Sequence, residues 1–172
     1  MINSEFISVN EFFVKQLLQN VKFVVFDFDG VFTDNMVITG QDGHESVRCS
    51  RSDGYGLMRL RKRGIDTLVL SSEKNPVVAA RCKKLGIKCQ QGFEEKLGQF
   101  KSEIASRNLS ANQVAYVGND INDIDCLKFA GVPITVFDAM KEVLPYGLIR
   151  TVHSGGKGAV REVCDVIERS HL

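Results

Sequence analysis

The sequence predicts an α/β fold: a three-layer, Rossmann-like parallel sheet with helices on both faces. The first observation is a rhythm, because short β-branched runs alternate with longer segments of helical periodicity. The second is the run KFVVF at residues 22–26, which is almost entirely apolar and therefore suits a central strand buried on both faces. The third is the length, since 172 residues suffice for one ordinary domain with a full core.

The composition narrows the classes of function. The 22 basic and 21 acidic side chains leave a net charge of +1, which argues against a general nucleic-acid binder. No apolar run approaches the ~20 residues that span a bilayer, so no membrane partner is expected. The five cysteines are odd in number and form no CxxC pair, which argues against a disulfide scaffold. The start MINSEFISVN lacks the basic region of a signal peptide, so we expect a cytoplasmic protein.

The first 20 residues predict a helical extension, and residues 21–172 predict the main domain. Ser8 and Glu11 have the spacing of a capping box, and apolar residues then recur at helical spacing. After the first strand, the segments MVIT and HESVRC flank the turn-forming sequence GQDG. This pattern predicts a β-hairpin within about residues 31–49.

The later elements follow in alternation. One helix is expected from Asp53 to Gly64, and the next from Pro76 to about Gly86. The other predicted strands are DTLVL (66–70), IKC (87–89), VAYVG (114–118), PITVF (133–137) and LIRTV (148–152). The other predicted helices are residues 94–107, residues 123–129, a short helix near Met140 and residues 159–170.

Polar side chains follow several of the predicted strands. In open parallel sheets, ligands bind at the carboxyl ends of the strands, beside a topological switch point. The residues placed there are Asp27, Asp29, Ser71, Lys96, Asn119 and Asp120. Carboxylates, a hydroxyl group and an ammonium group are therefore expected to converge on one edge of the sheet.

This set of side chains predicts phosphoryl transfer. Clustered oxygen ligands suit a hard cation such as Mg²⁺, which keeps the carboxylates ionised and lets Asp27 act as a nucleophile. Asp29 lies two residues further on, so in an extended segment its side chain points the same way and can serve as general acid. Ser71 and Lys96 can donate hydrogen bonds to phosphate oxygens.

The ordered motifs resemble the haloacid dehalogenase superfamily of phosphotransferases. The resemblance covers roughly Val21 to Ile167 and is closest to one branch: 3-deoxy-octulosonate 8-phosphate phosphatases, nonulosonate 9-phosphate phosphatases and phosphatase domains of some acylneuraminate cytidylyltransferases. The motifs that carry it are DFDGVFTD at Asp27–Asp34, SDGYG at Ser52–Gly56, QG at Gln91–Gly92 and SGGKGAVRE at Ser154–Glu162.

The resemblance implies a role for each site residue. Asp27 would be the nucleophile, Asp29 the acid/base, and Ser71 and Lys96 the phosphoryl-binding pair. Mg²⁺ would bind the Asp27 carboxylate and the Asp29 main-chain carbonyl. The hairpin would replace a larger cap domain, and the protein would be a homotetramer in which a neighbour's hairpin closes each site.

One position departs from the pattern of the branch. Many octulosonate phosphatases read GDD where this chain reads Gly118-Asn119-Asp120. The third metal ligand is therefore Asn119 acting through its amide oxygen, or else Asp120 or Asp123.

The substrate is predicted from the residues after Ser71. By resemblance, a glutamate such as Glu73 points to a nonulosonate, whereas octulosonate enzymes usually have Gly-Arg in this region. Ser72 lies beside Glu73, and Arg81 and Lys84 follow one and two turns along the next helix, where they can approach a sugar carboxylate.

The leading hypothesis is a Mg²⁺-dependent phosphatase for a phosphorylated 3-deoxy-2-keto sugar acid. One alternative is a non-catalytic tetramerisation module that partners an acylneuraminate cytidylyltransferase. A second alternative is a protein phosphatase or phosphotransfer regulator, which an open site in a monomer would permit.

Overall fold

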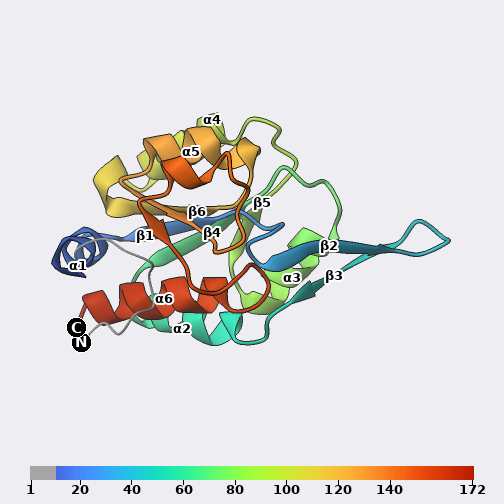
Figure 1. The fold of residues 1–172 in the computed structure, drawn as a ribbon, viewed down its shortest axis with the longest axis horizontal. Helices are drawn as coiled ribbons and strands as arrows, with labels where there is room; N and C mark the ends of the chain where they lie inside the picture. Colours follow the sequence, from blue (N-terminus) through green and yellow to red (C-terminus); the bar gives the residue numbers. More distant parts are fainter. Residues whose placement is uncertain (1–10) are drawn as a thin grey trace.

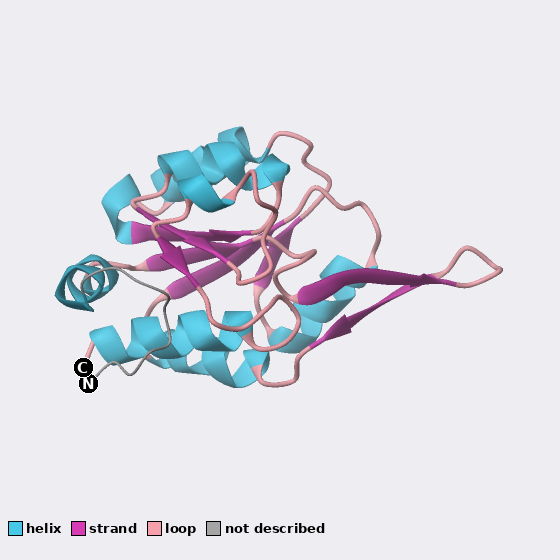
Figure 2. Ribbon diagram, viewed as in Figure 1, coloured by secondary structure: helices cyan, strands magenta, loops and turns pink. Residues whose placement is uncertain are grey.

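A six-stranded parallel sheet forms the centre of the molecule, in a computed structural model that describes residues 11–172. Its strand order is β5-β4-β1-β6-β7-β8 (Figures 1 and 2). The strands are β1 (Phe23–Phe26), β4 (Asp66–Leu70), β5 (Lys88–Gln90), β6 (Val114–Gly118), β7 (Val132–Thr135) and β8 (Ile149–Arg150). The α/β sheet predicted from the sequence is confirmed.

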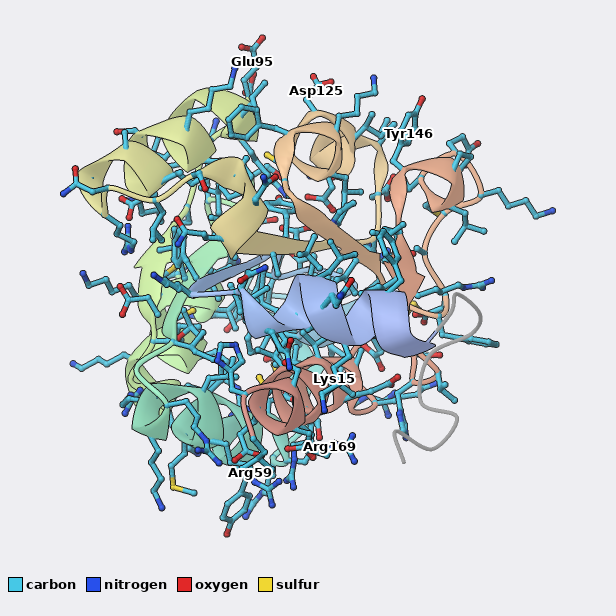
Figure 3. The ribbon with its side chains drawn as sticks, turned by 90° about the vertical axis from the view of Figure 1, so that its left-hand side faces the viewer. Lys15, Arg59, Glu95, Asp125, Tyr146 and Arg169 are labelled. Atoms are coloured by element: carbon cyan, nitrogen blue, oxygen red, sulfur yellow. The ribbon has the colours of Figure 1, made fainter. Side chains whose placement is uncertain are left out.

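Helices cover both faces of this sheet. On one face lie α4 (Lys96–Ser106) and α5 (Ile124–Phe129), and on the other lie α2 (Asp53–Lys62), α3 (Val77–Leu85) and α6 (Ala159–Ser170). Helix α1 (Glu11–Gln19) crosses the end of the sheet opposite the hairpin, between the two helical layers (Figure 3). Short 3₁₀ turns cover Ala111–Gln113, Ile121–Asp123 and Leu144–Tyr146. No helix among residues 11–172 is long and apolar enough to cross a membrane.

Strand β1 is central to the fold because its side chains pack into both halves of the core, one on each face of the sheet. Val24 and Phe26 pack against the layer of α2 and α6, whereas Phe23 and Val25 pack against the layer of α4 and α5. All four side chains are fully buried. Each contributes about 1.5–3 kcal/mol by leaving water. The chain places β4 on one side of β1 and β6 on the other, so the topological switch point lies at the end of β1.

The predicted hairpin is present and projects away from the body of the molecule (Figure 1). It pairs β2 (Thr33–Thr39) with β3 (Glu45–Cys49) in antiparallel fashion. Gly43 takes a positive φ of 79° in the connecting turn. Thr33 is the only buried residue of β2. Strand β3 contacts the body of the molecule through Val47, which packs against the core, and through Glu45, which accepts a hydrogen bond from Asn75 at 3.0 Å.

Three details of the sequence prediction differ or fall outside the description. The helix expected near Met140 is wrong: the amide of Met140 donates to the carbonyl of Asn119, and a 3₁₀ turn follows only at Leu144–Tyr146. This tertiary bond holds the backbone in a turn and leaves no continuous helical ladder there. Pro76 is the N-cap of α3, so that helix begins one residue later. The capping box assigned to Ser8 lies outside the described residues.

A glycine-rich segment before α6 packs directly on the loop that follows β1. We call residues 154–158 the strap. The amide of Gly156 donates to the carbonyl of Val31, and the amide of Gly155 donates to Asp138. A Cβ atom at Gly155 would overlap the carbonyl of Gly30, so only glycine allows the two backbones to approach this closely.

We predict that Gly155→Ala lowers the free energy of unfolding by about 1–3 kcal/mol, because the added methyl group must displace the backbone at Gly30. Gly98→Ala is the matched control, since Gly98 lies in α4 with open space around it. That change should stabilise the protein by ~0.5–1 kcal/mol through helix propensity. Thermal unfolding measures both variants, and a Gly155→Ala protein as stable as the Gly98→Ala protein would contradict the close approach.

Candidate active site

The polar residues at the strand ends meet in one cavity, as the sequence predicts. The amide of Asp27 donates to Val117 at the end of β6, and the amide of Ser71 donates to Gln90 at the end of β5. These bonds fix both residues just beyond the sheet. We call the cavity of about 280 Å³ there the nucleophile cavity. Its lining includes Asp27, Asp29, Ser71, Ser72, Asn119 and Asp120.

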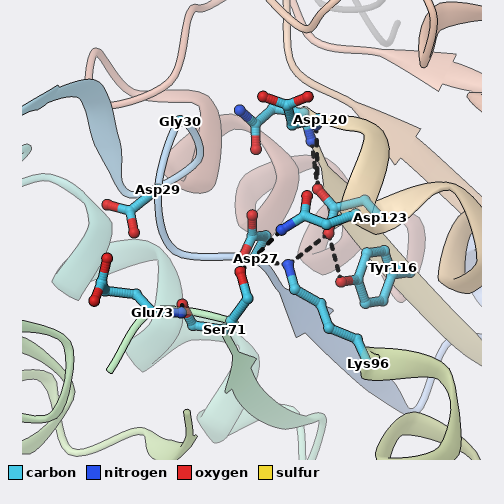
Figure 4. A network of polar contacts seen from close by, with 12 residues as sticks. Asp27, Asp29, Gly30, Ser71, Glu73, Lys96, Tyr116, Asp120 and Asp123 are labelled. Atoms are coloured by element: carbon cyan, nitrogen blue, oxygen red, sulfur yellow. Dashed lines mark hydrogen bonds and ion pairs between the residues drawn. The ribbon is translucent and has the colours of Figure 1, made fainter. Parts of the chain in front are cut away.

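A buried ammonium group is the centre of this site (Figure 4). Lys96 is the first residue of α4, and its fully buried Nζ lies 2.7 Å from Asp27 Oδ1 and 2.8 Å from Asp123 Oδ1. Burial by itself would lower the pKa of Lys96, but the two carboxylates raise it well above the usual range. Lys96 therefore carries a permanent positive charge beside Asp27.

Asp123 is fully occupied by hydrogen-bond donors. Its Oδ1 accepts from Lys96 Nζ and, at 2.7 Å, from the hydroxyl group of Tyr116. Its Oδ2 accepts from the amides of Asn119 and Asp120, at 2.9 and 3.3 Å. With these four donors its lone pairs are used. Asp123 thus acts as a positioning residue in this structure, where its carboxylate already accepts four hydrogen bonds.

Burial raises the pKa of two acidic groups in the nucleophile cavity, Asp27 and Asp29. Burial raises the pKa of Asp27 to about 7, Asp123 adds to the effect, and Lys96 opposes it. Burial also raises the pKa of Asp29, and the neighbouring Glu73 raises it further. An additional positive charge in the cavity would keep Asp27 ionised.

Asp27 and Asp29 converge for a different reason from the extended segment that the sequence predicts. Both residues line the nucleophile cavity, but the chain between them is not extended. It bends at Phe28, whose ring is buried in the core, and turns at Asp29 and Gly30, where φ is +74°. A tight turn, and not strand alternation, brings the second carboxylate to the cavity.

The oxygen ligands of the site fit a hard cation. Asn119 is almost fully buried, and its Oδ1 has no hydrogen-bond partner. The Asn119 amide group packs directly against Gly30. A Cβ atom at residue 30 would overlap this amide group, so the close contact requires glycine. Asp120, by contrast, accepts from the amides of Ile121 and Asp123 as the cap of the 3₁₀ turn. The unpartnered oxygen of Asn119 is thus the better free ligand beside Asp27.

Acidic side chains alone do not make up a metal site here. Among residues 11–172, no three His, Cys, Asp or Glu side chains are grouped so as to hold a metal ion. The other oxygen ligands that the sequence predicts here are the amide oxygen of Asn119 and, by resemblance, the main-chain carbonyl of Asp29. Both are ordinary ligands for Mg²⁺.

Ser72 and Glu73 lie at the mouth of the site. The hydroxyl group of Ser72 accepts from Asn122 at 3.0 Å, across the cavity entrance. Glu73 Oε1 accepts from the amides of Lys74 and Asn75, at 2.6 and 2.7 Å. The Glu73 carboxylate lies near that of Asp29 (Figure 4) and lines a second cavity of about 300 Å³, which Asp29 joins to the first.

Arg81 and Lys84 do not line the nucleophile cavity, although the sequence suggests that they approach the substrate there. They line a third hollow of about 620 Å³ together with Arg51. Val47 and Val77 belong to both the second cavity and this hollow, so the two are contiguous. Arg81 also donates to the carbonyl of Ser50 at 2.6 Å, which ties α3 to the end of the hairpin.

Sequence reasoning missed three residues of the site. In the sequence, Tyr116 is an ordinary residue of a predicted strand. The fold brings its hydroxyl group to Asp123, and no sequence signal predicts this contact. Asn35 lines the first two cavities with a positive φ of 61°. An asparagine after an aspartate is a recognisable turn signal that predicts this backbone form. Thr33, at the base of the hairpin, lies within hydrogen-bond distance of Asp29.

Comparison with known proteins agrees with this geometry. No protein-family model matches the chain. A curated 3-deoxy-D-manno-octulosonate 8-phosphate phosphatase from Yersinia pestis is 34% identical over 155 residues, which are 90% of this chain and 83% of that protein.

Solved structures show the same similarity in three dimensions. The crystal structure of the 3-deoxy-D-manno-octulosonate 8-phosphate phosphatase from Yersinia pestis superposes with a TM-score of 0.91 at 31% identity, covering 98% of this chain and 94% of that one. The Moraxella catarrhalis enzyme in complex with magnesium, phosphate and KDO gives 0.90 at 28% identity, covering 94% and 93%. The chain therefore belongs to the 3-deoxy-D-manno-octulosonate 8-phosphate phosphatase family of the haloacid dehalogenase superfamily.

Proposed function

We propose that this protein is a Mg²⁺-dependent phosphomonoesterase that acts on a phosphorylated 3-deoxy-2-keto sugar acid through an aspartyl-phosphate intermediate. The observation that carries the proposal is the Asp27 carboxylate, held 2.7 Å from the buried Lys96 ammonium in a cavity shared with Asp29 and Ser71. A nucleophile, an acid and two phosphate donors are thus assembled at one point.

The reaction divides into two steps. In the first, Asp27 attacks the phosphorus atom, and Asp29 gives its proton to the leaving alcohol as the P–O bond breaks. In the second, Asp29 takes a proton from a water molecule, whose oxygen attacks the phosphorus and releases phosphate from Asp27. Asp29 ends protonated, as it began, so the cycle closes.

Ser71 and Lys96 stabilise the charge on the phosphoryl oxygens during both steps. The residues that would hold Mg²⁺ are Asp27, Asn119 and the main chain of Asp29. When bound, Mg²⁺ supplies positive charge that keeps the Asp27 carboxylate ionised and neutralises charge on the phosphoryl group.

The adjoining cavities suit a substrate that extends beyond its phosphate group. The Moraxella catarrhalis relative binds magnesium, phosphate and KDO, which supports octulosonate 8-phosphate as the substrate class. Glu73 in the second cavity supports a nonulosonate 9-phosphate as the alternative. The hollow lined by Arg51, Arg81 and Lys84 offers positive charge for a sugar carboxylate at the far end.

The intact site supports catalysis over a purely structural role. A non-catalytic partner of a cytidylyltransferase would have no use for a buried Lys96–Asp27 pair, whose desolvation is costly. The small nucleophile cavity likewise suits a phosphate monoester of a small molecule.

We also propose that the hairpin docks on another copy in a homotetramer. Met36, Val37 and Ile38 expose 69%, 52% and 63% of their surface. Three consecutive exposed apolar residues on a projecting strand favour burial in an interface.

Phosphate release from octulosonate 8-phosphate and nonulosonate 9-phosphate, with and without Mg²⁺, tests the proposed function. We expect turnover of at least one ester that requires Mg²⁺. Asp27→Asn should lower kcat by at least ~10³-fold because an amide is a poor nucleophile. Asp125→Asn is the control, since that carboxylate is exposed on α5. Activity retained in Asp27→Asn would remove Asp27 from the mechanism.

Calorimetric titration of the metal-free protein with Mg²⁺ distinguishes the ligands. Asn119→Asp should tighten binding roughly tenfold, because a carboxylate adds negative charge to a site for a hard cation. Asp120→Asn should change the affinity little, since Asp120 caps the 3₁₀ turn. The reverse pattern, in which Asp120→Asn weakens binding and Asn119→Asp is silent, would assign the ligand to Asp120.

We predict that Glu73 contributes to catalysis by contacting the sugar part of the substrate. We expect Glu73→Ala to lower kcat/KM for a nonulosonate phosphate about tenfold and to leave a minimal phosphate ester without sugar hydroxyls nearly unchanged. Glu73→Gln keeps an oxygen for the amides of Lys74 and Asn75, so it separates turn capping from charge. Equal losses on both substrates would show that Glu73 supports the site without reading the sugar.

Light scattering tests the assembly. The wild-type protein should have four times the mass of the chain, and Ile38→Lys should dissociate it, because a charged side chain cannot be buried in an apolar interface. An active wild-type monomer would rule out the proposed tetramer.

A further inference from the structure

The hydroxyl group of Thr33 is surrounded by three polar groups of the catalytic turn. Thr33 is fully buried at the base of the hairpin. Its Oγ1 accepts from the amide of Gly30 at 3.0 Å and from the amide of Asn35 at 3.1 Å. The third neighbour is Asp29 Oδ1, at 3.4 Å.

The direction of this third hydrogen bond follows from counting. A hydroxyl group has one proton and two lone pairs. The two amides of Gly30 and Asn35 use the lone pairs, so the proton of Thr33 is directed to the Asp29 carboxyl group. The backbone amides therefore hold the hydroxyl oxygen in place, and its proton faces Asp29 Oδ1.

The strap holds the same turn from its other side. The amide of Gly156 donates to the carbonyl of Val31 at 3.1 Å. A Cβ atom at Gly155 would meet the carbonyl of Thr33 at 2.9 Å, besides overlapping Gly30. The turn is thus held by the Thr33 hydroxyl group on one side and packed against two glycines of the strap on the other.

We propose that Thr33 is the positioning residue that aims the Asp29 carboxyl group at the leaving oxygen in the first step and at the attacking water in the second. The proposal rests on the phosphatase function above, in which Asp29 is the acid and then the base. It assigns a task in proton transfer to the base of the hairpin.

Proton transfer from Asp29 matters only when the leaving group needs it. The oxygen of a primary alcohol is strongly basic and must receive a proton as the P–O bond breaks, whereas a nitrophenolate leaves without one. A misaimed Asp29 should therefore slow the first step for an alkyl phosphate and spare it for an aryl phosphate. The second step, attack by water on the aspartyl-phosphate, should be slowed for both.

The experiment compares Thr33→Val with wild type on octulosonate 8-phosphate and on 4-nitrophenyl phosphate. With the sugar ester, kcat/KM should fall about 10²-fold, the usual scale of general acid catalysis. With the aryl ester, kcat/KM should stay within about threefold, because it reports only the first step. Its kcat should fall, with a burst of nitrophenolate that approaches one equivalent of enzyme.

Three further variants isolate the hydroxyl group. Thr33→Ser keeps the hydroxyl group and should restore both rates to within about threefold of wild type. Thr67→Val makes the same change in β4, at the opposite end of the sheet, and should leave both rates unchanged. In an Asp29→Asn background, Thr33→Val should cost nothing more, since a residue that acts through Asp29 has lost its target.

The outcomes separate this inference from the proposed function. If the wild-type protein hydrolyses neither of the two sugar-acid phosphates nor the aryl ester, the phosphatase function fails, and the inference with it. Where only nonulosonate 9-phosphate is turned over, that ester replaces octulosonate 8-phosphate in the comparison. If the wild type is active and Thr33→Val loses kcat/KM equally on both esters, or loses more in the Asp29→Asn background, Thr33 is a structural residue and the inference is overturned. Should Thr33→Val not fold, Thr33→Ala undergoes the same comparison, with the same two results deciding.

Discussion

The buried ammonium group of Lys96 is the interaction on which the site depends. Removing this charge from water is costly, and only two carboxylates at 2.7 and 2.8 Å compensate for it. Asp27 brings the end of β1 to Lys96, and Asp123 brings the segment after β6. Since Asp123 also binds the amides of Asn119 and Asp120, one charge fixes the nucleophile and the candidate metal ligand together.

Close backbone contacts are the second condition for this arrangement. Gly30 lies against the amide of Asn119, and Gly155 lies against Gly30. Each contact removes the space that a Cβ atom would need, so the strap, the catalytic turn and the loop after β6 form one packed unit. The consequence is a preorganised site, in which donors are aimed before the substrate arrives.

The hairpin connects the site to an exposed apolar surface. Its base belongs to the catalytic turn through Thr33, while its outer strand exposes Met36 and Ile38. One short element thus contacts the reacting groups at one end and presents an apolar surface at the other. Hairpin residues also line the second cavity, where the sugar of the proposed substrate would bind.

The sequence by itself determined the order of the elements and the chemistry at the strand ends. Apolar runs and glycine or proline boundaries are local signals, so the parallel sheet, the hairpin and the cavity of Asp27, Asp29 and Ser71 were predictable. Tertiary structure decided which oxygen is free. Asn119 and Asp123 look equally able to bind a cation in sequence, yet four donors fill Asp123, among them Lys96 from 27 residues away, and none reaches Asn119 Oδ1. Hydrogen bonds between residues far apart in the chain leave no local pattern, and for that reason only the fold assigns them.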